Sequence, residues 1–164
     1  MISTKSNVLA SIIGLEGSTT LLLELIKGKH LQVEIVSQRE ELIQDHCYIK
    51  RTTKLFFDTP DEPALYCISY LDKKVLTSME YYYLMQKNMP IGKLFIHLNT
   101  EEGIKKNNIT VVVEEDEEIS CFLKVNSAWL YKKKYDYWVD GRKIGNITEM
   151  FNEESLHRIN NHDE

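Results

Sequence analysis

The stretch CYIKRTTKLFFDTPDEPALYCISYL, residues 47–71, is the longest strand-like region of the chain. Two runs rich in β-branched and aromatic residues, 47–57 and 64–71, flank the segment DTPDEP. Proline and aspartate favour turns, and proline cannot continue a central strand. The pattern therefore predicts a β-hairpin whose turn lies at residues 58–63.

A second hairpin is predicted from DYWVDGRKIGNITEMF, residues 136–151. The Asp-Gly pair at 140–141 gives the turn, and apolar residues flank it. Glu149 lies in the returning strand, with Ile147 two residues before it and Phe151 two residues after it. Residues two apart on a strand share a face, so a carboxylate is expected on the same face as two buried apolar side chains.

Helices are predicted before and after the first hairpin. A short helix is expected at 7–15, and a second one begins within GSTTLLLELIKGKH, residues 17–30. Ser18 can accept a hydrogen bond from a free N–H of the first turn, and Gly28 is well placed to end the helix. The segment TSMEYYYLMQKN, residues 77–88, predicts a third helix, capped by the threonine or the serine at its start.

The remaining segments predict a sheet. Leu31, Val33 and Ile35 alternate with polar residues and indicate a strand. Further strands are expected at KLFIHL (93–98), NITVVVE (108–114) and ISCFLKV (119–125), with a charged connection at 114–118. The order of elements predicts an α+β fold: one domain over residues 1–164, with a mainly antiparallel β-sheet and helices packed on one side. A polar tail from about residue 152 is expected to fray.

Composition limits the partners of this domain. The formal net charge of -5 disfavours nucleic-acid binding, and the lysines at 105–106 and 132–134 are interpreted as solvated stretches. Three separated cysteines form no disulfide framework and fit a reducing cytoplasm. No apolar run approaches the ~20 residues that span a bilayer, and the apolar segment near the N-terminus is too short for a signal peptide. A small-molecule partner remains, and the oligomeric state stays open.

Local motifs do not indicate a metal site. The acidic run 114–118 lacks the alternating ligand spacing of a calcium loop, and HRINNH, residues 157–162, lies in a polar tail without converging carboxylates. Two other charged residues break the pattern of their strands. Arg51 shares a face with Ile49, and Glu149 shares one with Ile147. One interpretation is a buried structural ion pair, or two charges that reach solvent. The other is a pocket in which the arginine holds a substrate carboxylate and the glutamate handles a proton.

Four segments, in order, resemble the chorismate–pyruvate lyase family, and more closely its small lyase-like members. They are LEGSTTLLLE (15–24), YIKRTTKLFFDTPDEPALYCISYL (48–71), MPIGKLF (89–95) and WVDGRKIGNITEMF (138–151). The resemblance implies an antiparallel sheet with a ligand site beneath helical flaps, which we expect at 15–24 and 77–86. It also implies that pyruvate is removed from chorismate to leave 4-hydroxybenzoate, with no cofactor or metal.

The resemblance also assigns residues to the site. Arg51 falls where the family binds a carboxylate, and Glu149 falls where an acid faces the ring oxygen; these two are the implied catalytic residues. Thr19 falls on the flap helix near the ligand, and the backbone of Ile91 or Gly92 falls where a main-chain N–H reaches it.

Two alternatives stay open at this stage. One is a lyase that acts on a related chorismate-derived substrate. The other is a non-catalytic aromatic-acid binder, because the same fold serves as a sensing domain in transcription regulators. Those regulators carry an N-terminal helix-turn-helix, for which the sequence has no room before residue 15; this favours the lyase.

Overall fold

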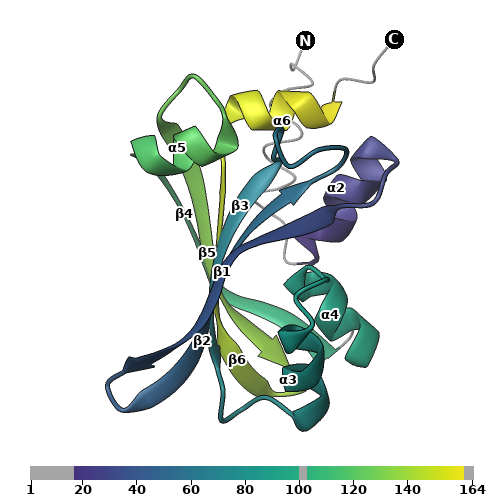
Figure 1. The fold of residues 1–164 in the computed structure, drawn as a ribbon, viewed down its shortest axis with the longest axis vertical. Helices are drawn as coiled ribbons and strands as arrows, with labels where there is room; N and C mark the ends of the chain where they lie inside the picture. Colours follow the sequence, from purple (N-terminus) through teal and green to yellow (C-terminus); the bar gives the residue numbers. More distant parts are fainter. Residues whose placement is uncertain (1–16, 100–102, 161–164) are drawn as a thin grey trace.

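The computed structural model describes residues 17–99 and 103–160, and the helix expected at 7–15 lies outside them. A six-stranded antiparallel sheet in the order β1-β2-β3-β6-β5-β4 forms its centre (Figure 1). The strands are β1 (Gln32–Ile43), β2 (His46–Phe56), β3 (Leu65–Asp72), β4 (Ile104–Glu115), β5 (Trp129–Val139) and β6 (Arg142–Phe151). The helices are α2 (Thr19–Lys27), α3 (Ser78–Met85), α4 (Ile91–Leu98), α5 (Glu117–Leu123) and α6 (Glu153–Asn160).

Both predicted hairpins are confirmed, and together they make the middle of the sheet. The first hairpin is β2 and β3, and the second is β5 and β6. Asp140 and Gly141 both take positive φ values, 48° and 75°, as a two-residue turn between twisted strands requires. Strands β3 and β6 then pair, with Cys67 opposite Glu149. The stretch 47–71 thus provides two strands to which the second hairpin is added.

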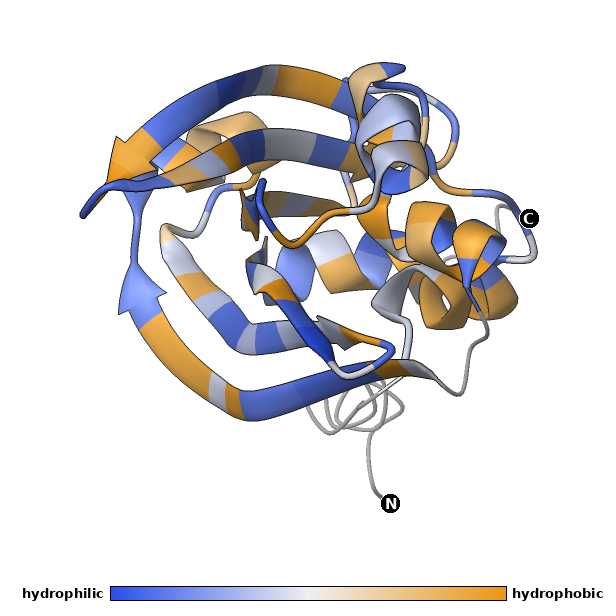
Figure 2. Cartoon of the chain, turned by 90° about the horizontal axis from the view of Figure 1, so that it is seen from below, coloured by the Kyte–Doolittle hydropathy of each residue, from blue (hydrophilic) through white to orange (hydrophobic). Residues whose placement is uncertain are grey.

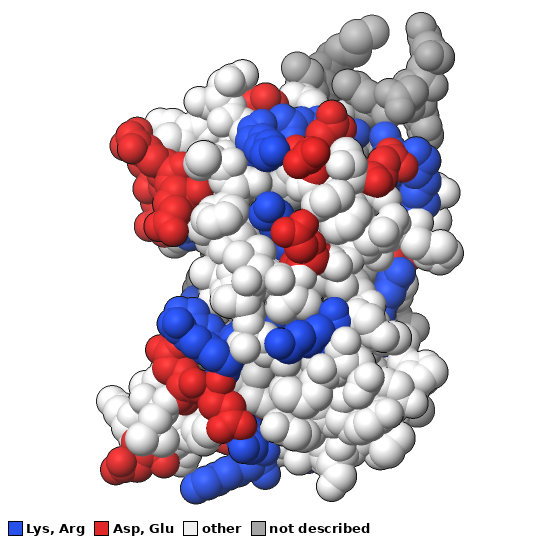
Figure 3. Space-filling view, viewed as in Figure 1, with Lys and Arg blue, Asp and Glu red and all other residues white. Residues whose placement is uncertain are grey.

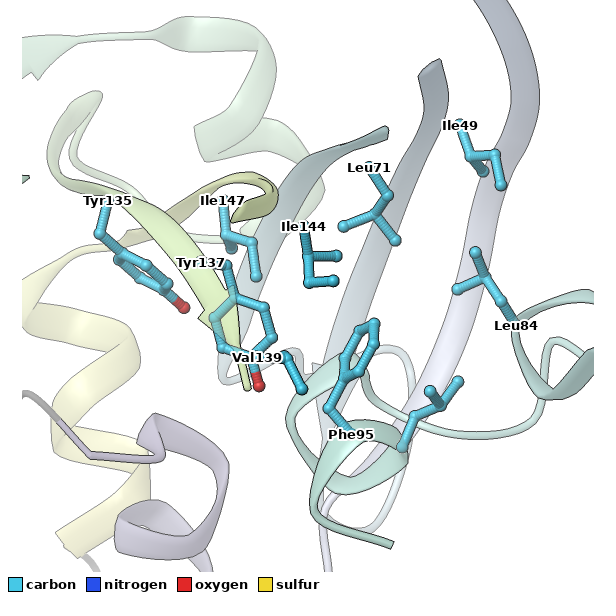
Figure 4. Packing of buried hydrophobic residues seen from close by; sticks show 10 residues of the cluster. Ile49, Leu71, Leu84, Phe95, Tyr135, Tyr137, Val139, Ile144 and Ile147 are labelled. Carbon is cyan, nitrogen blue, oxygen red and sulfur yellow. The ribbon is translucent and has the colours of Figure 1, made fainter. Parts of the chain in front are cut away.

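The sheet is strongly curved, and α2, α3, α4 and α6 lie on its hollow side (Figures 1 and 2). Helices α3 and α4 bury Leu84 and Phe95 against strand residues that include Leu71 and Tyr137 (Figure 4). Helices α2 and α6 pack on another part of the same face, through a cluster that contains Leu23, Leu55, Leu65, Phe151 and Leu156. The predicted antiparallel sheet with helices on one side is confirmed. The small helix α5 also packs against strand residues of the opposite face, Tyr66, Leu130 and Met150.

Two segments expected as strands are helices, and this expectation was wrong. Residues 93–98 belong to α4, which begins directly after Pro90. Proline suits the start of a helix, and a short apolar run does not by itself distinguish strand from helix. Residues 119–125 overlap α5, whose N-cap Asp116 accepts a hydrogen bond from the Ile119 N–H. Of the acidic run, residues 114–115 end β4, and residues 116–118 are the N-cap and first turn of α5, where negative charge is favourable.

The C-terminal segment is also more ordered in structure than expected. Asn152 caps the start of α6 through its side-chain oxygen, which accepts from the Ser155 N–H at 2.8 Å. Leu156 and Ile159 are buried against the core, one turn apart on the same side of the helix. Their spacing shows why this segment, polar in composition, folds onto the domain.

On the face drawn in Figure 3, basic and acidic side chains are interspersed, without a continuous basic surface. None of the helices in the described ranges is long and apolar enough to cross a membrane.

Candidate functional site

A cavity of about 210 Å³ lies between the hollow face of the sheet and the first turns of α2 and α4. Its helical side is formed by residues 17–20 and 90–92, and its floor by side chains of β2 to β6. Much of the wall is apolar, including Leu55, Leu65 and Ile147. An apolar cavity of about 150 Å³ holds benzene, so this space suits a single substituted ring.

Glu149 is the carboxylate at one end of this cavity, and it is 5% exposed. The Thr19 hydroxyl donates to its Oε2 at 2.9 Å, and the Tyr135 hydroxyl donates to its Oε1 at 2.8 Å. Burial, together with the neighbouring Glu149 charge, raises the pKa of Tyr135 well above its ordinary value. The phenol therefore stays protonated and keeps donating. This network fixes the position of the carboxylate between two elements, α2 and β5.

Two lysines expected as solvated are buried beside Glu149, and for them that expectation was wrong. Lys106 Nζ lies 3.9 Å from Glu149 Oε1 and donates to the Thr19 hydroxyl at 3.2 Å. Lys133 pairs with Glu149 across the β5–β6 ladder and is 0% exposed. Burial lowers the pKa of Lys106, opposed by the Glu149 charge. Burial, and repulsion from Lys106, lower the pKa of Lys133 to about 8.

The sequence did contain a signal for these two lysines. Lys133 alternates with Tyr131 and Tyr135, and Lys106 lies two residues from Ile104, so each shares a face with residues that pack inward. The immediate neighbour Lys105 points the other way and is exposed. In each cluster one lysine lies on the inward face, as the two-residue period of a strand requires.

Arg51 is 1% exposed and lies beside the cavity, but its side chain is not part of the lining. Its Nη2 donates to the Met89 carbonyl at 2.6 Å, one residue before Pro90 of the cavity wall. Its Nε and Nη1 are buried and have no hydrogen-bond partner within residues 17–99 and 103–160. Burial lowers the pKa of Arg51 to about 10, so it remains a cation at neutral pH.

The structural ion pair between Arg51 and Glu149, expected as one alternative, is not formed between these two described residues. The strand register explains why. Glu149 is opposite Cys67, and Cys67 is opposite Thr53, which lies two residues beyond Arg51 on β2. Standard strand spacings place the Arg51 and Glu149 Cα atoms roughly 12 Å apart, diagonally across three strands. A ring with substituents at both ends can occupy such a separation.

The first turn of α4 provides further hydrogen-bond donors next to Arg51. Pro90 is the N-cap of α4 and makes no side-chain capping bond. Helix N-termini leave N–H groups unsatisfied and carry partial positive charge, which suits an anion. Ile91 and Gly92 of this turn line the cavity. Arg51 and the start of α4 thus form a cationic region at the cavity wall.

The structure brings the assigned residues together around one space. Glu149, Thr19, Ile91 and Gly92 line the cavity, and Arg51 adjoins it through Met89. The flap expected at 77–86 is placed differently, since α3 contributes no residue to the lining and α4 covers the cavity with α2. The cavity is covered by the first turns of α2 and α4, which both line it, and this is why α4 takes the place expected for α3. No group of three or more His, Cys, Asp or Glu within the described ranges is arranged to hold a metal ion.

Sequence comparison decides the family. The sequence family described as "Chorismate pyruvate-lyase Rv2949c-like" matches residues 13–159. The chain belongs to this family. No curated protein matches the sequence. The resemblance stated from the four sequence segments is therefore confirmed, and so is the chorismate lyase-like fold.

Several solved structures share this fold, and some of them are described as transcriptional regulators. PhnF from Mycobacterium smegmatis aligns with a TM-score of 0.59 at 10% identity, over 85% of this chain and 65% of PhnF. The effector domain of PhnF alone aligns with a TM-score of 0.56 at 12% identity, over 82% of this chain and 88% of the effector domain. A GntR-family transcriptional regulator from Enterococcus faecalis V583 aligns with a TM-score of 0.55 at 10% identity, over 73% of this chain and 91% of the regulator chain. At these identities the likeness concerns the fold alone, and the chain spans less than two thirds of the full PhnF length.

Proposed function

We propose that this protein is a lyase that converts chorismate to 4-hydroxybenzoate and pyruvate, using Arg51 and Glu149 as its principal site residues. Family membership gives the reaction class. The observation that carries the proposal is the cavity itself, which has the size of one ring, a fixed carboxylate on its wall, and the Arg51 guanidinium adjoining it at a separate place.

The reaction needs little chemistry from the protein. The proton leaves the ring carbon that carries the hydroxyl, and its bonding pair forms the last ring double bond. The neighbouring carbon–oxygen bond breaks, and its electron pair leaves with the enolpyruvyl group. That group takes up one proton on its methylene carbon and becomes pyruvate. Aromatisation provides the driving force, so the protein must bind, orient and manage one proton.

Each residue has a role in this proposal. The planar guanidinium of Arg51 binds the ring carboxylate with its two unpartnered donors, assisted by the N–H groups of Ile91 and Gly92. Glu149 faces the ring hydroxyl and the proton that is lost, and Thr19 and Tyr135 hold it in place. No cofactor is required by this scheme. The three free cysteines fit a cytoplasmic enzyme.

The test is to incubate the purified protein with chorismate and to follow pyruvate and 4-hydroxybenzoate separately. We expect both products in equal amounts and at a rate proportional to protein. A different aromatic product with equimolar pyruvate would overturn the assignment of 4-hydroxybenzoate.

A second candidate is a non-catalytic binder of aromatic acids, which the fold likeness to an effector domain favours. The same titration distinguishes the two. Tight binding of 4-hydroxybenzoate without any pyruvate release from chorismate would favour the binder over the lyase.

A further inference from the structure

Lys106 is a charged residue to which the proposed function assigns no role. It comes from β4, one of the two edge strands of the described sheet, yet its side chain points inward, is 4% exposed and lines the cavity. Its Nζ also lies 4.5 Å from the centre of the Tyr135 ring. An edge strand can leave its lysines in water at no cost. A buried position for this one therefore needs a reason.

The partners of Lys106 within the described part of the chain do not satisfy it. An ammonium group has three donors, and the Thr19 hydroxyl is the hydrogen-bond acceptor it reaches. Glu149 Oε1, at 3.9 Å, is beyond hydrogen-bond distance, and that oxygen already accepts from Tyr135. A buried charge is costly unless its hydrogen bonds are complete. Donors of Lys106 therefore remain for an acceptor inside the cavity.

This acceptor cannot be the carboxylate that Arg51 binds. Arg51 adjoins the cavity beside Met89 and the start of α4, on the β2 side of the sheet. Lys106 reaches it from β4, at the other edge, beside Glu149. Two cationic regions that approach the cavity from different strands are complementary to a ligand with two anionic groups. Lys133, opposite Glu149 and with a pKa of about 8, adds positive charge on the β4 side.

We propose that Lys106 anchors a second carboxylate, so that the cavity selects ligands with two carboxylates across one ring over ligands with one. The inference rests on the proposed function and deepens it, because chorismate carries one carboxylate on its ring and another on its enolpyruvyl group. Lys106 then determines specificity and holds the leaving group next to Glu149.

The test uses two unreactive probes that differ in one carboxylate. They are 3-(carboxymethoxy)benzoate, a diacid, and 3-ethoxybenzoate, a monoacid that has a methyl group in place of the second carboxylate. Calorimetric titration at neutral pH should show that the parent binds the diacid at least ~10-fold more tightly, as charge-assisted hydrogen bonds imply. Lys106→Met should reduce this preference to less than about threefold and leave the monoacid affinity within about threefold of the parent.

The chain offers a matched control in Lys105→Met, one residue away on the exposed face, which should keep the full preference. Lys106→Arg should keep part of the preference for the diacid. Should Lys106→Met fail to fold in thermal unfolding, Lys106→Gln takes its place in the same titrations. An equal loss for both probes, an unchanged preference, or a parent without any preference would overturn the inference.

The result of this test can be distinguished from the result of the test of the proposed function. A Lys106-dependent preference for the diacid in a protein that releases no pyruvate keeps this inference and overturns the lyase. Turnover of chorismate with the same kcat/KM in the parent and in Lys106→Met keeps the lyase and overturns the role of Lys106.

Discussion

Among the residues that the structure describes, two glutamates are buried, Glu80 in α3 and Glu149 in β6, and their surroundings differ. Glu80, 2% exposed, accepts from both terminal nitrogens of Arg142, at 2.6 and 3.1 Å, and from the Thr77 N–H at 2.8 Å. Glu149, 5% exposed, has hydroxyl donors and a lysine at 3.9 Å, and it borders a cavity.

The arginines differ in the same way. Arg142 also donates to the Val75 carbonyl, so its guanidinium is held by the protein. Arg51 makes one bond to a carbonyl and keeps two buried donors without a partner in the described ranges. Where Arg and Glu are structural, this fold places them in a bidentate pair. Arg51 and Glu149 are instead kept apart around a space, and in our proposal the missing partner of each is a ligand.

The largest effect is expected from Glu149→Gln, which keeps the shape and the acceptor for Tyr135 but removes the base. Chorismate turnover should fall by about 100- to 10,000-fold, the usual range for losing a positioned acid or base. Stability should change little, because water or ligand reaches the site. Pyruvate release and thermal unfolding on the same sample measure both.

Glu80→Gln is the matched control for this substitution. It breaks the bidentate pair with Arg142 and should lower stability by about 1–3 kcal/mol, with activity per folded molecule within about twofold of the parent. If Glu149→Gln instead melts early and loses activity only in proportion to folded protein, Glu149 is as structural as Glu80 and the comparison fails.

Removal of Arg51 should separate affinity from stability. Arg51→Ala should weaken binding of 4-hydroxybenzoate by about 30- to 1000-fold, because a charge-assisted pair in an enclosed site is lost. Arg51→Lys should restore only part of the affinity, since lysine lacks the planar guanidinium that can bind both carboxylate oxygens. Arg51→Met should fold at least as stably as the parent, because a buried cation with unsatisfied donors is removed.

For Arg142→Met we expect the opposite result, namely a clear loss of stability and an affinity close to that of the parent. Equal affinity of Arg51→Ala and the parent for 4-hydroxybenzoate would refute the placement of the carboxylate site.

The sequence alone predicted much of this comparison but not its electrostatics. The hairpins around 58–63 and 140–141 followed from turn chemistry, and the inward faces of Arg51 and Glu149 followed from the two-residue period of strands. These are local properties. The family resemblance then assigned Arg51, Glu149 and the backbone of Ile91 or Gly92 to one site, although the helix that begins there was expected as a strand.

What the sequence did not predict depends on pairing between distant segments. Lys106 becomes a neighbour of Glu149 only because β4 is added next to β5, and Thr19 reaches Glu149 only because α2 packs on that face. Composition predicted a strand at residues 119–125, but 119–123 belong to α5, whose N-cap Asp116 accepts a hydrogen bond from the Ile119 N–H. Such outcomes follow from tertiary contacts and from capping geometry that periodicity does not capture.

A pH dependence should come from Lys133, which faces Glu149 and Lys106. The protonated form favours an anion in the cavity, and its pKa without ligand is about 8. Affinity for 3-ethoxybenzoate should therefore be constant near pH 7 and fall by about tenfold as pH rises through 8. In Lys133→Met this decline should disappear.

The same lysine should also make stability depend on pH, but stability should rise with pH where affinity falls. Its folded-state pKa of about 8 lies below the ordinary 10.5, so the unfolded chain binds more protons between these values. Lys133 should make the free energy of unfolding rise with pH across that window. A parent and a Lys133→Met variant with identical pH profiles from 7 to 10 would show that Lys133 does not titrate there.

The smallest effect is expected at the ion pair that joins the two flap helices over the cavity. Glu24 of α2 pairs with Lys93 of α4, and the same carboxylate accepts from the Leu31 N–H. Burial opposes ionisation, yet the hydrogen bonds from Lys93, His30 and Leu31 hold the pKa of Glu24 below its ordinary value. The pair is partly exposed, so it is worth about 0.5–1 kcal/mol.

Lys93→Gln should therefore speed release of 4-hydroxybenzoate by about two- to fivefold, because opening of the flaps no longer breaks the pair. Lys29→Gln, which breaks the exposed pair with Asp58 away from the cavity, is the control and should leave the rate unchanged. Added salt should speed release from the parent more than from Lys93→Gln, since screening weakens the same pair. Stopped-flow displacement measures the rate directly. A release rate that Lys93→Gln does not alter, with a salt response equal to that of the parent, would mean that α2 and α4 do not open against each other when product leaves.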